Sequence, residues 1–401
     1  MSQTEPGRRT LRRNIRELPR PAWILIAGSF INRFGSFVVP FLVLYLRGQG
    51  FSIAQAGVAV AAYGGGEVIA GPIGGWLADR LGRRSTIAIS TFSSAAAMIG
   101  LYLVHTYVAI VALAFVAGLV SEARRPASLA LLTDLVPDGQ RVTVFAVLRL
   151  AESVAFAGGI ALGGFLANTT FAWLFVGDAA SSIVYGTIAM TLLPEGHGPG
   201  AAISDEVATG ARHPAGYGGI LADRAFAIFL IATVLLAFVY FQQLATLPLH
   251  VRASGLSNAQ FGLLLSLNGV LLVIFELPLS SWTMHRPQRQ MIGLGFLLVG
   301  LGFGLTAMAH SFATLALTVA IWTAGEMVAA PVSYAYVADI APQDMRGRYQ
   351  GLYGLAFGSG AIIGPALGTF LYSLSPTAFW SLCGALGLVS ALLALAGRPA
   401  R

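Results

Sequence analysis

The apolar and polar positions of the chain fall into long blocks. Apolar stretches of about 20 residues or more recur along the whole length, separated mostly by short polar loops. A stretch of this length crosses a bilayer as one helix. We therefore predict an all-α membrane protein with twelve transmembrane helices, at approximately 21–46, 53–79, 85–105, 107–134, 143–168, 171–193, 225–250, 258–283, 290–309, 311–339, 348–373 and 376–396.

The composition agrees with this prediction. The 401 residues are 56% hydrophobic and only 10% charged, whereas soluble domains carry about 25% charged residues. The single cysteine, Cys383, excludes an intrachain disulfide and a CxxC metal site. The sequence also lacks a nucleophile elbow, a phosphate-binding loop and a His/Cys cluster. We therefore expect neither an enzyme nor a bound cofactor or metal.

The arginines predict how the chain is oriented. One alternate set of loops holds nearly all the loop arginines, and the other set holds only Arg47 and Arg252. Basic loops stay on the cytoplasmic side, so we predict a bacterial inner-membrane protein with both termini cytoplasmic. The first 20 residues contain six arginines and form a basic arm that is expected to contact anionic lipid. The net charge of +7 therefore indicates membrane lipids as partners rather than nucleic acid.

An internal repeat divides the chain into two halves. A shift of 205 residues aligns 125–141 with 330–346, so that Pro126 meets Pro331 and Asp134 meets Asp339. Two parallel six-helix halves are typical of transporters that bind substrate near the midplane between them. We predict a basic arm at 1–20, a six-helix bundle at 21–193, a cytoplasmic linker at 194–224 and a second bundle at 225–397. We expect the chain to act as a monomer on a small-molecule substrate.

The loop after the second predicted helix carries a recognisable motif, GGWLADRLGRRSTI at 74–87. It resembles the signature of the major facilitator superfamily, G-x-L-a-D-R-x-G-R-R/K-x-x-L. The resemblance extends over the whole chain through the twelve spans, the central loop and the repeat. It implies that this loop latches the two halves together on the cytoplasmic side, with Asp79 facing the start of the eleventh span. The expected gating residues are Gly75, Asp79, Arg80, Gly82, Arg83, Arg84 and Asp134.

Within that superfamily, the length and the short loops are similar to those of the small bacterial drug/proton antiporters. The fifth span keeps the glycines of their G-x-x-x-G-P-x-x-G-G motif but has Ile160 where the proline is expected. The arginine usual in the first half of their fourth span is missing. The similarity in length and loops implies proton-coupled efflux of amphiphilic molecules or drugs. A metabolite symporter or importer and a lysophospholipid or lipid transporter of the same fold remain alternatives.

Charged residues inside membrane spans are costly and usually face a bundle interior or an aqueous cavity. The spans of this chain contain Arg33, Glu67, Glu122, Arg124, Arg125, Arg149, Glu152, Asp178, Glu276 and Glu326. The pairs Glu122/Arg125 and Arg149/Glu152 are three residues apart, so each can form an ion pair along one helix face. Asp178 suits helix packing and transport equally well.

Glu326 differs from the other acids, because no basic residue lies within four positions of it. Removal of a carboxyl group from water favours its protonated form, which suits a group that takes up and releases a proton. The resemblance also implies a coupling role for an acid in the tenth span. We predict Glu326 as the main proton-coupling residue, followed by Glu152, Glu67 and Glu276.

The remaining polar residues of the spans are candidates for contact with substrate. We predict a substrate cavity lined by Arg33, Glu122, Arg125, Arg149, Gln242, Gln243 and Asp178. Gln242 and Gln243 are adjacent, and adjacent side chains of a helix leave it in different directions. We therefore expect at most one of these two amides to point fully into the cavity.

Overall fold

The computed structural model describes residues 17–137, 140–195, 220, 223–283, 285–342 and 345–396. Most of the predicted basic arm and of the predicted linker lies outside these residues. Twelve helices in the described part are long and apolar enough to cross a membrane, which confirms the predicted number. No strand occurs in the described ranges, so the all-α prediction is confirmed.

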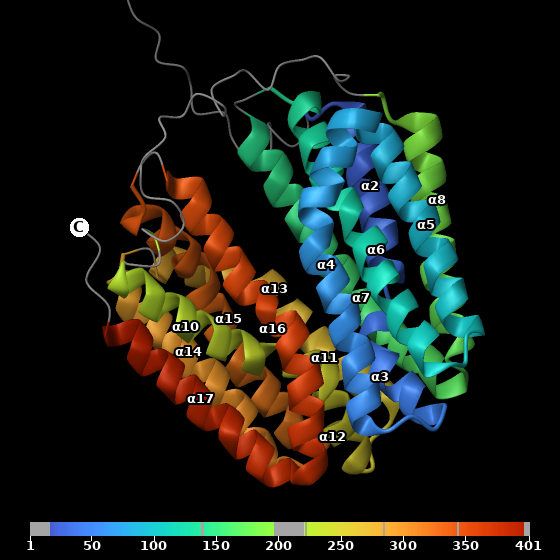
Figure 1. The fold of residues 1–401 in the computed structure, drawn as a ribbon. Coiled ribbons are helices and arrows are strands. Elements are labelled where there is room, and N and C mark those ends of the chain that lie inside the picture. Colours follow the sequence, from blue (N-terminus) through green and yellow to red (C-terminus); the bar gives the residue numbers. More distant parts are fainter. Residues whose placement is uncertain are drawn as a thin grey trace, which may run out of the picture.

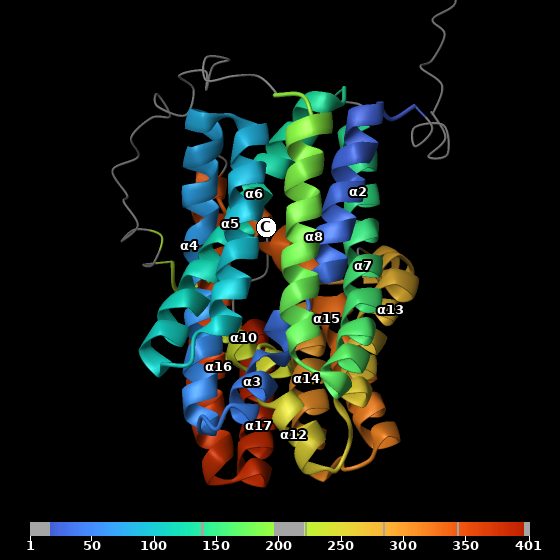
Figure 2. The same cartoon turned by 90° about the vertical axis from the view of Figure 1, so that its right-hand side faces the viewer.

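The helices form two bundles of six spans each (Figure 1). The first bundle contains α2 (Arg20–Gly35), α3 (Val38–Gly48), α4 (Ile53–Leu81), α5 (Arg83–Leu103), α6 (Tyr107–Leu135), α7 (Arg141–Thr169) and α8 (Ala172–Leu192). The second contains α10 (Arg224–Tyr240), α11 (Gln242–Ala245), α12 (Leu247–Ala253), α13 (Asn258–Thr283), α14 (Gln288–Leu305), the 3₁₀ turn η2 (Thr306–Met308), α15 (Phe312–Ile340), α16 (Arg346–Leu374) and α17 (Pro376–Ala396). The helices run roughly parallel to one another in the first bundle (Figure 2).

Local sequence explains where several spans begin. Ser52 accepts a hydrogen bond from the Gln55 N–H at 3.1 Å, and the Gln55 side chain accepts one from the Ser52 N–H at 2.9 Å. This reciprocal capping satisfies N–H groups that have no partner within the helix. Ser311 and Thr314 cap the start of α15 in the same way.

The first and seventh spans are not continuous helices, contrary to the simple spans predicted at 21–46 and 225–250. The first is interrupted at Ser36 and Phe37, between α2 and α3, and the seventh is interrupted at Phe241 and Thr246. Pro40 has no N–H to donate to the Ser36 carbonyl four residues earlier, and proline commonly weakens a helix at this point. Positions 36 and 241 correspond under the 205-residue shift. Interrupted helices at matching positions of two repeats are the typical location of a transporter's binding site.

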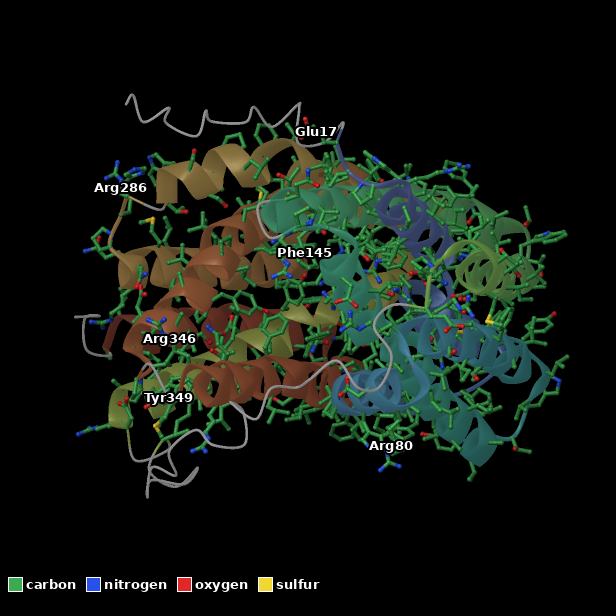
Figure 3. The ribbon with its side chains drawn as sticks, turned by 90° about the horizontal axis from the view of Figure 1, so that it is seen from above. Glu17, Arg80, Phe145, Arg286, Arg346 and Tyr349 are labelled. Atoms are coloured by element: carbon green, nitrogen blue, oxygen red, sulfur yellow. The ribbon has the colours of Figure 1, made fainter. Side chains whose placement is uncertain are left out.

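The two bundles are closely packed in the half of the molecule away from the arginine-rich loops. We call the end that bears Arg80, Arg286 and Arg346 the basic end (Figure 3), and the other the opposite end. At the opposite end, α7 packs on α13 through Gly164 and Gly262. A Cβ atom placed on Gly262 would lie only 3.0 Å from the Gly164 Cα, so a larger side chain would separate these helices.

Hydrogen bonds also stabilise the contact between α7 and α13. The Asn258 amide donates to the Ala167 carbonyl at 3.0 Å, and the Ala259 N–H donates to the Asn168 side chain at 3.3 Å. The second contact between the bundles joins α4 to α16, where Gly64 packs against Ala361. The opposite end is therefore closed to solvent between the bundles.

At the basic end the bundles diverge (Figure 1). A Cβ atom placed on Gly71 or Gly75 of α4 would meet no other described atom within 4 Å. The same is true of Gly347, Gly351 and Gly354 on α16, the helix that α4 contacts at the opposite end. The molecule therefore adopts a conformation that is open at the basic end.

A buried polar contact holds α12 against α17 near the opposite end. The Trp380 Nε1–H donates to His250 Nδ1 at 3.2 Å, and the other ring nitrogen of His250 lies 2.9 Å from the Ala309 carbonyl. Because Nδ1 accepts, Nε2 must carry the proton and donate, so the imidazole is neutral. Trp380 is fully buried and stacks on Phe303.

Replacing Trp380 with Phe is expected to lower the stability of the protein by about 1–3 kcal/mol, because His250 Nδ1 would lose its donor in a buried position. The measurement is the thermal unfolding midpoint of purified protein in detergent. Trp282→Phe is the matched control, since the Trp282 ring is 46% exposed and contacts the Arg286 guanidinium. An equal decrease in the two variants would contradict the assigned hydrogen bond.

Candidate functional site

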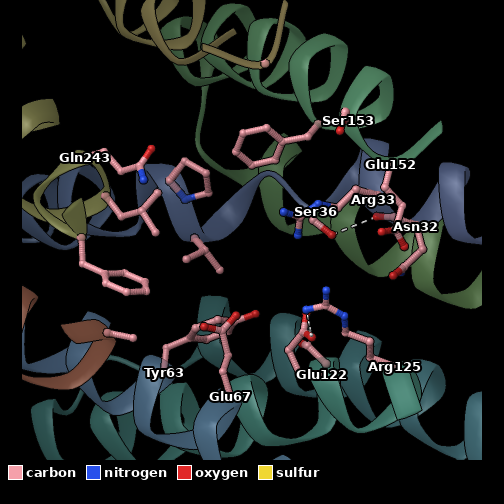
Figure 4. Close-up of a pocket in the computed structure, with 18 of the residues that line it drawn as sticks. Asn32, Arg33, Ser36, Tyr63, Glu67, Glu122, Arg125, Glu152, Ser153 and Gln243 are labelled. Atoms are coloured by element: carbon pink, nitrogen blue, oxygen red, sulfur yellow. Dashed lines mark hydrogen bonds and ion pairs between the residues drawn. The ribbon is translucent and has the colours of Figure 1, made fainter. Parts of the chain in front are cut away.

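A cavity of about 650 Å³ lies between the two bundles. Its walls come from the interrupted spans and from α4, α5, α6, α7, α8, α13, α15 and α16, so both bundles contribute (Figure 4). Nine charged side chains line it: Arg33, Glu67, Glu122, Arg124, Arg125, Arg149, Glu152, Asp178 and Glu326. These residues are far apart in the sequence, and the fold brings them to one site.

On the α6 wall, Glu122 and Arg125 form the predicted local pair, with 3.9 Å between Arg125 Nη1 and Glu122 Oε2. Arg124, on another face of the same helix, is buried. Its positive charge acts on Asp178 of α8. Two of the three charges of this part of α6 therefore balance each other, and the third acts on an acid of α8.

Asp178 has a structural partner that the sequence does not reveal. The Val38 N–H, at the first residue of α3, donates a hydrogen bond to the Asp178 carboxyl group. A carboxylate at a helix N-terminus stabilises the exposed N–H groups and the positive end of the helix dipole. Asp178 therefore lines the cavity and also stabilises the restart of the first span after its interruption.

Glu326 of α15 is bonded only to neutral donors among the described residues. The Tyr240 hydroxyl donates to Oε1 at 3.0 Å, and the Asn268 amide donates to Oε2 at 3.0 Å. Asn268 also donates to Thr323 at 3.0 Å, which orients its amide. These residues come from α10, α13 and α15, so the site belongs to the second bundle. No basic residue lies within four positions of Glu326 in the sequence. Among the described residues, no basic side chain forms a hydrogen bond or ion pair with it either.

Arg149 and Glu152 do not form the predicted local pair. Arg149 of α7 instead donates to Glu276 of α13, so the ion pair joins the two bundles. The reason is tertiary: α7 and α13 are neighbours across the interface, which brings Glu276 to Arg149. Glu276 itself is absent from the cavity lining, whereas Glu152 lines the cavity and has no ion pair within the described residues.

Of the two adjacent amides, only Gln243 lines the cavity. Gln242 is fully buried against α16. It donates to the Gly364 carbonyl at 3.0 Å and to the Phe238 carbonyl at 2.8 Å, and it accepts from the Thr246 hydroxyl. The prediction that at most one amide enters the cavity is confirmed, and the placement of Gln242 among the cavity residues is corrected.

The signature loop is tied to the first bundle in this conformation. Arg83 forms an ion pair with Asp134 and donates to the Ala130 carbonyl at 2.8 Å, and Arg84 pairs with Glu195 at 2.6 Å. Gly82 has φ of +85°, a backbone conformation that glycine adopts at little cost. Asp134 therefore pairs with an arginine of the signature loop within its own bundle.

Arg80 and Asp79 of the signature form no hydrogen bond or ion pair with the described residues of the second bundle. Arg80 lies over the Trp76 ring at 4.5 Å. Asp79 is exposed and forms no hydrogen bond or ion pair with the described residues. In Figure 3, Arg80 and Arg346 lie apart on the two bundles. The implied contact of Asp79 with the start of the eleventh span is therefore not made in this conformation, because the basic end is open.

Sequence reasoning missed the aromatic part of the cavity. Tyr63, Phe156, Tyr240, Phe241 and Phe357 all line it. Tyr240 and Phe241 precede the two glutamines that drew attention to the seventh span. The interruption of the seventh span places Tyr240 and Phe241 in the cavity. Because this interruption is visible only in the structure, the sequence analysis did not find these residues.

A large cavity between two pseudo-symmetric six-helix bundles defines a membrane transport protein of the secondary-transporter type. The profile of the Major Facilitator Superfamily matches residues 25–259 and 243–401. The chain belongs to this superfamily, and it is a transporter rather than an enzyme.

Individual relatives are distant but cover most of the chain. An uncharacterized MFS-type transporter, YttB, of Bacillus subtilis (strain 168) is 27% identical, over 88% of this chain and 89% of the relative. A Na(+), Li(+), K(+)/H(+) antiporter of Planococcus maritimus is 26% identical, over 85% and 87%. The multidrug resistance protein MdtH of Aeromonas salmonicida (strain A449) is 24% identical, over 92% and 94%.

Solved structures show the same fold. A crystal structure of the nucleoside transporter NupG superposes with a TM-score of 0.82, at 16% identity, over 94% of this chain and 99% of that chain. A crystal structure of a D-xylose-proton symporter gives 0.74 at 17% identity, over 98% and 99%. At these identities the comparison establishes the fold only.

Proposed function

We propose that the protein is a proton-coupled antiporter that exports small amphiphilic molecules by alternating access. The observation that carries the proposal is Glu326, a carboxyl group in the cavity wall that contacts the neutral donors Tyr240 and Asn268. Such a group can exist in either protonation state without leaving a buried cation unpaired. Relatives named as an antiporter and as a multidrug resistance protein support the direction of transport.

The proposed cycle uses the two bundles as rigid bodies. The basic end faces the cytoplasm of a bacterial cell, with both termini on that side, because basic loops remain cytoplasmic. In the present conformation substrate enters from the cytoplasm, and its binding favours release of the proton from Glu326. In the alternate conformation substrate leaves to the outside and Glu326 is protonated again. Substrate and proton each shift the equilibrium between the two conformations, because each interacts differently with them.

The energy source in this proposal is the proton gradient alone, and no cofactor takes part. One chain supplies both walls of the cavity, which supports action as a monomer. The aromatic side chains Phe156, Tyr240 and Phe357 give the cavity an apolar surface beside its charges. A surface of this mixed kind suits an amphiphilic substrate.

The direction of flux under an imposed pH gradient tests the proposal. In inverted membrane vesicles with an acidic interior, an antiporter is expected to drive uptake of a bound amphiphile. The amphiphile is first selected by thermal shift from a panel of octyl compounds with different headgroups. Gradient-driven release in place of uptake would contradict antiport and indicate a symporter.

A further inference from the structure

The charges of the cavity are not all matched within the protein. Arg125 pairs with Glu122, Arg149 pairs with Glu276, and Arg124 acts on Asp178. Glu326 has its neutral donors. Apart from Arg124, the charged lining residues that form no ion pair and no hydrogen bond among the described residues are Arg33, Glu67 and Glu152.

Arg33 is held in the cavity by the interruption of the first span. It lies in the last turn of α2, whose C-terminal end favours a positive charge. Its guanidinium lies 4.8 Å from the centre of the Phe156 ring, which supports the cation from behind. Its five N–H donors have no acceptor among the described residues, so they are available for a planar anionic group.

Glu67 faces the same space from α4 (Figure 4). The charges of Glu122, Arg33 and Arg125 all act on Glu67. Arg33 and Glu67 line the same cavity but form no ion pair or hydrogen bond with each other. Two opposite charges that face one cavity and are not bonded to each other leave room between them for a ligand.

We propose that Arg33 and Glu67 bind the two opposite charges of a zwitterionic substrate. The Arg33 guanidinium receives a carboxylate or phosphate group in bidentate geometry. The Glu67 carboxylate receives an ammonium group, beside the aromatic ring of Tyr63, which also lines the cavity. A substrate with only one charge would leave one partner without a counter-charge in a partly desolvated site, which is unfavourable.

This inference rests on the proposed function only in placing substrate in the cavity, and it does not depend on proton coupling. The test is equilibrium binding to the full chain in lipid nanodiscs, without a pH gradient. The probes share an octyl chain and lie below their micelle-forming concentrations. They are octylphosphocholine and N-octyl betaine as phosphate and carboxylate zwitterions, octyltrimethylammonium, octyl phosphate, and octyl glucoside.

The wild-type protein is expected to bind at least one zwitterion about tenfold or more tightly than either singly charged probe, as loss of one charge-assisted hydrogen bond would give. Arg33→Gln is expected to reduce zwitterion affinity to that for octyltrimethylammonium. Glu67→Gln is expected to reduce it to that for octyl phosphate. The matched controls are Arg252→Gln and Glu17→Gln, which lie outside the cavity and should leave all affinities unchanged.

Equal wild-type affinity for octyltrimethylammonium and for both zwitterions would overturn the proposal. So would unchanged zwitterion binding by folded Arg33→Gln protein, with folding checked by its thermal midpoint. A preference for phosphocholine over betaine, or the reverse, identifies the anionic group. Because binding is measured without a gradient, failure of gradient-driven uptake would refute the antiport mechanism while leaving this result intact.

Discussion

Glu326→Gln is expected to abolish gradient-driven transport while substrate still binds and exchanges. Glutamine keeps the size of the side chain and can still accept from Tyr240 or Asn268, so the fold should persist. It cannot release a proton, so the proposed cycle would lose the step that links the pH gradient to the change of conformation. We expect gradient-driven uptake into inverted vesicles to fall by at least about tenfold, equivalent to about 1.4 kcal/mol.

Two readouts separate loss of coupling from loss of structure. Exchange of labelled for unlabelled amphiphile without a gradient should remain near the wild-type rate, and the thermal midpoint should be unchanged. Glu17→Gln is the matched control, because Glu17 is an exposed residue outside the cavity. Unaltered gradient-driven uptake by the Glu326→Gln variant would exclude Glu326 as the coupling residue.

Gly75→Leu is expected to trap the protein in the conformation seen here. A side chain at Gly75 meets open space in this structure. In the alternate conformation the basic end of α4 must approach α16, and a leucine would then be overpacked at a cost of about 1–3 kcal/mol. Transport should therefore fall by about tenfold or more. Stability should not decrease, since leucine is a better helix former than glycine by up to about 1 kcal/mol.

The control is Gly48→Leu, at the end of α3. Gly48 also has no atom within 4 Å of an added Cβ, but it lies at the opposite end, outside the contacts between α4 and α16. Both variants are assayed for gradient-driven transport and for thermal midpoint. Normal transport by Gly75→Leu would show that α4 does not close on α16 at this residue.

The sequence alone was sufficient for the architecture. The number of spans follows from apolar length, which is a local property of the chain. The two-bundle fold follows from the 205-residue repeat around Pro126 and Pro331. The superfamily follows from the signature at 74–87. Charges within spans were also visible, because each interrupts an apolar run, and nine of those ten residues line the cavity.

The partners of those charges were decided by tertiary structure. Local spacing predicted Arg149 with Glu152, but the neighbouring α13 supplies Glu276. Asp178 stabilises the start of α3, which exists only because the first span is interrupted. Gln242 and Gln243 are equivalent in sequence, and the rotation of their helix against α16 separates their roles.

The conformational state is likewise a tertiary property. The same signature loop can contact the second bundle or leave it, and the open basic end leaves Asp79 exposed. Apolar length, charge placement and repeats act within one helix or one loop, so a single chain displays them directly. Ion pairs across bundles and the opening between them depend on how helices distant in sequence rotate and approach. Only the folded structure contains that information.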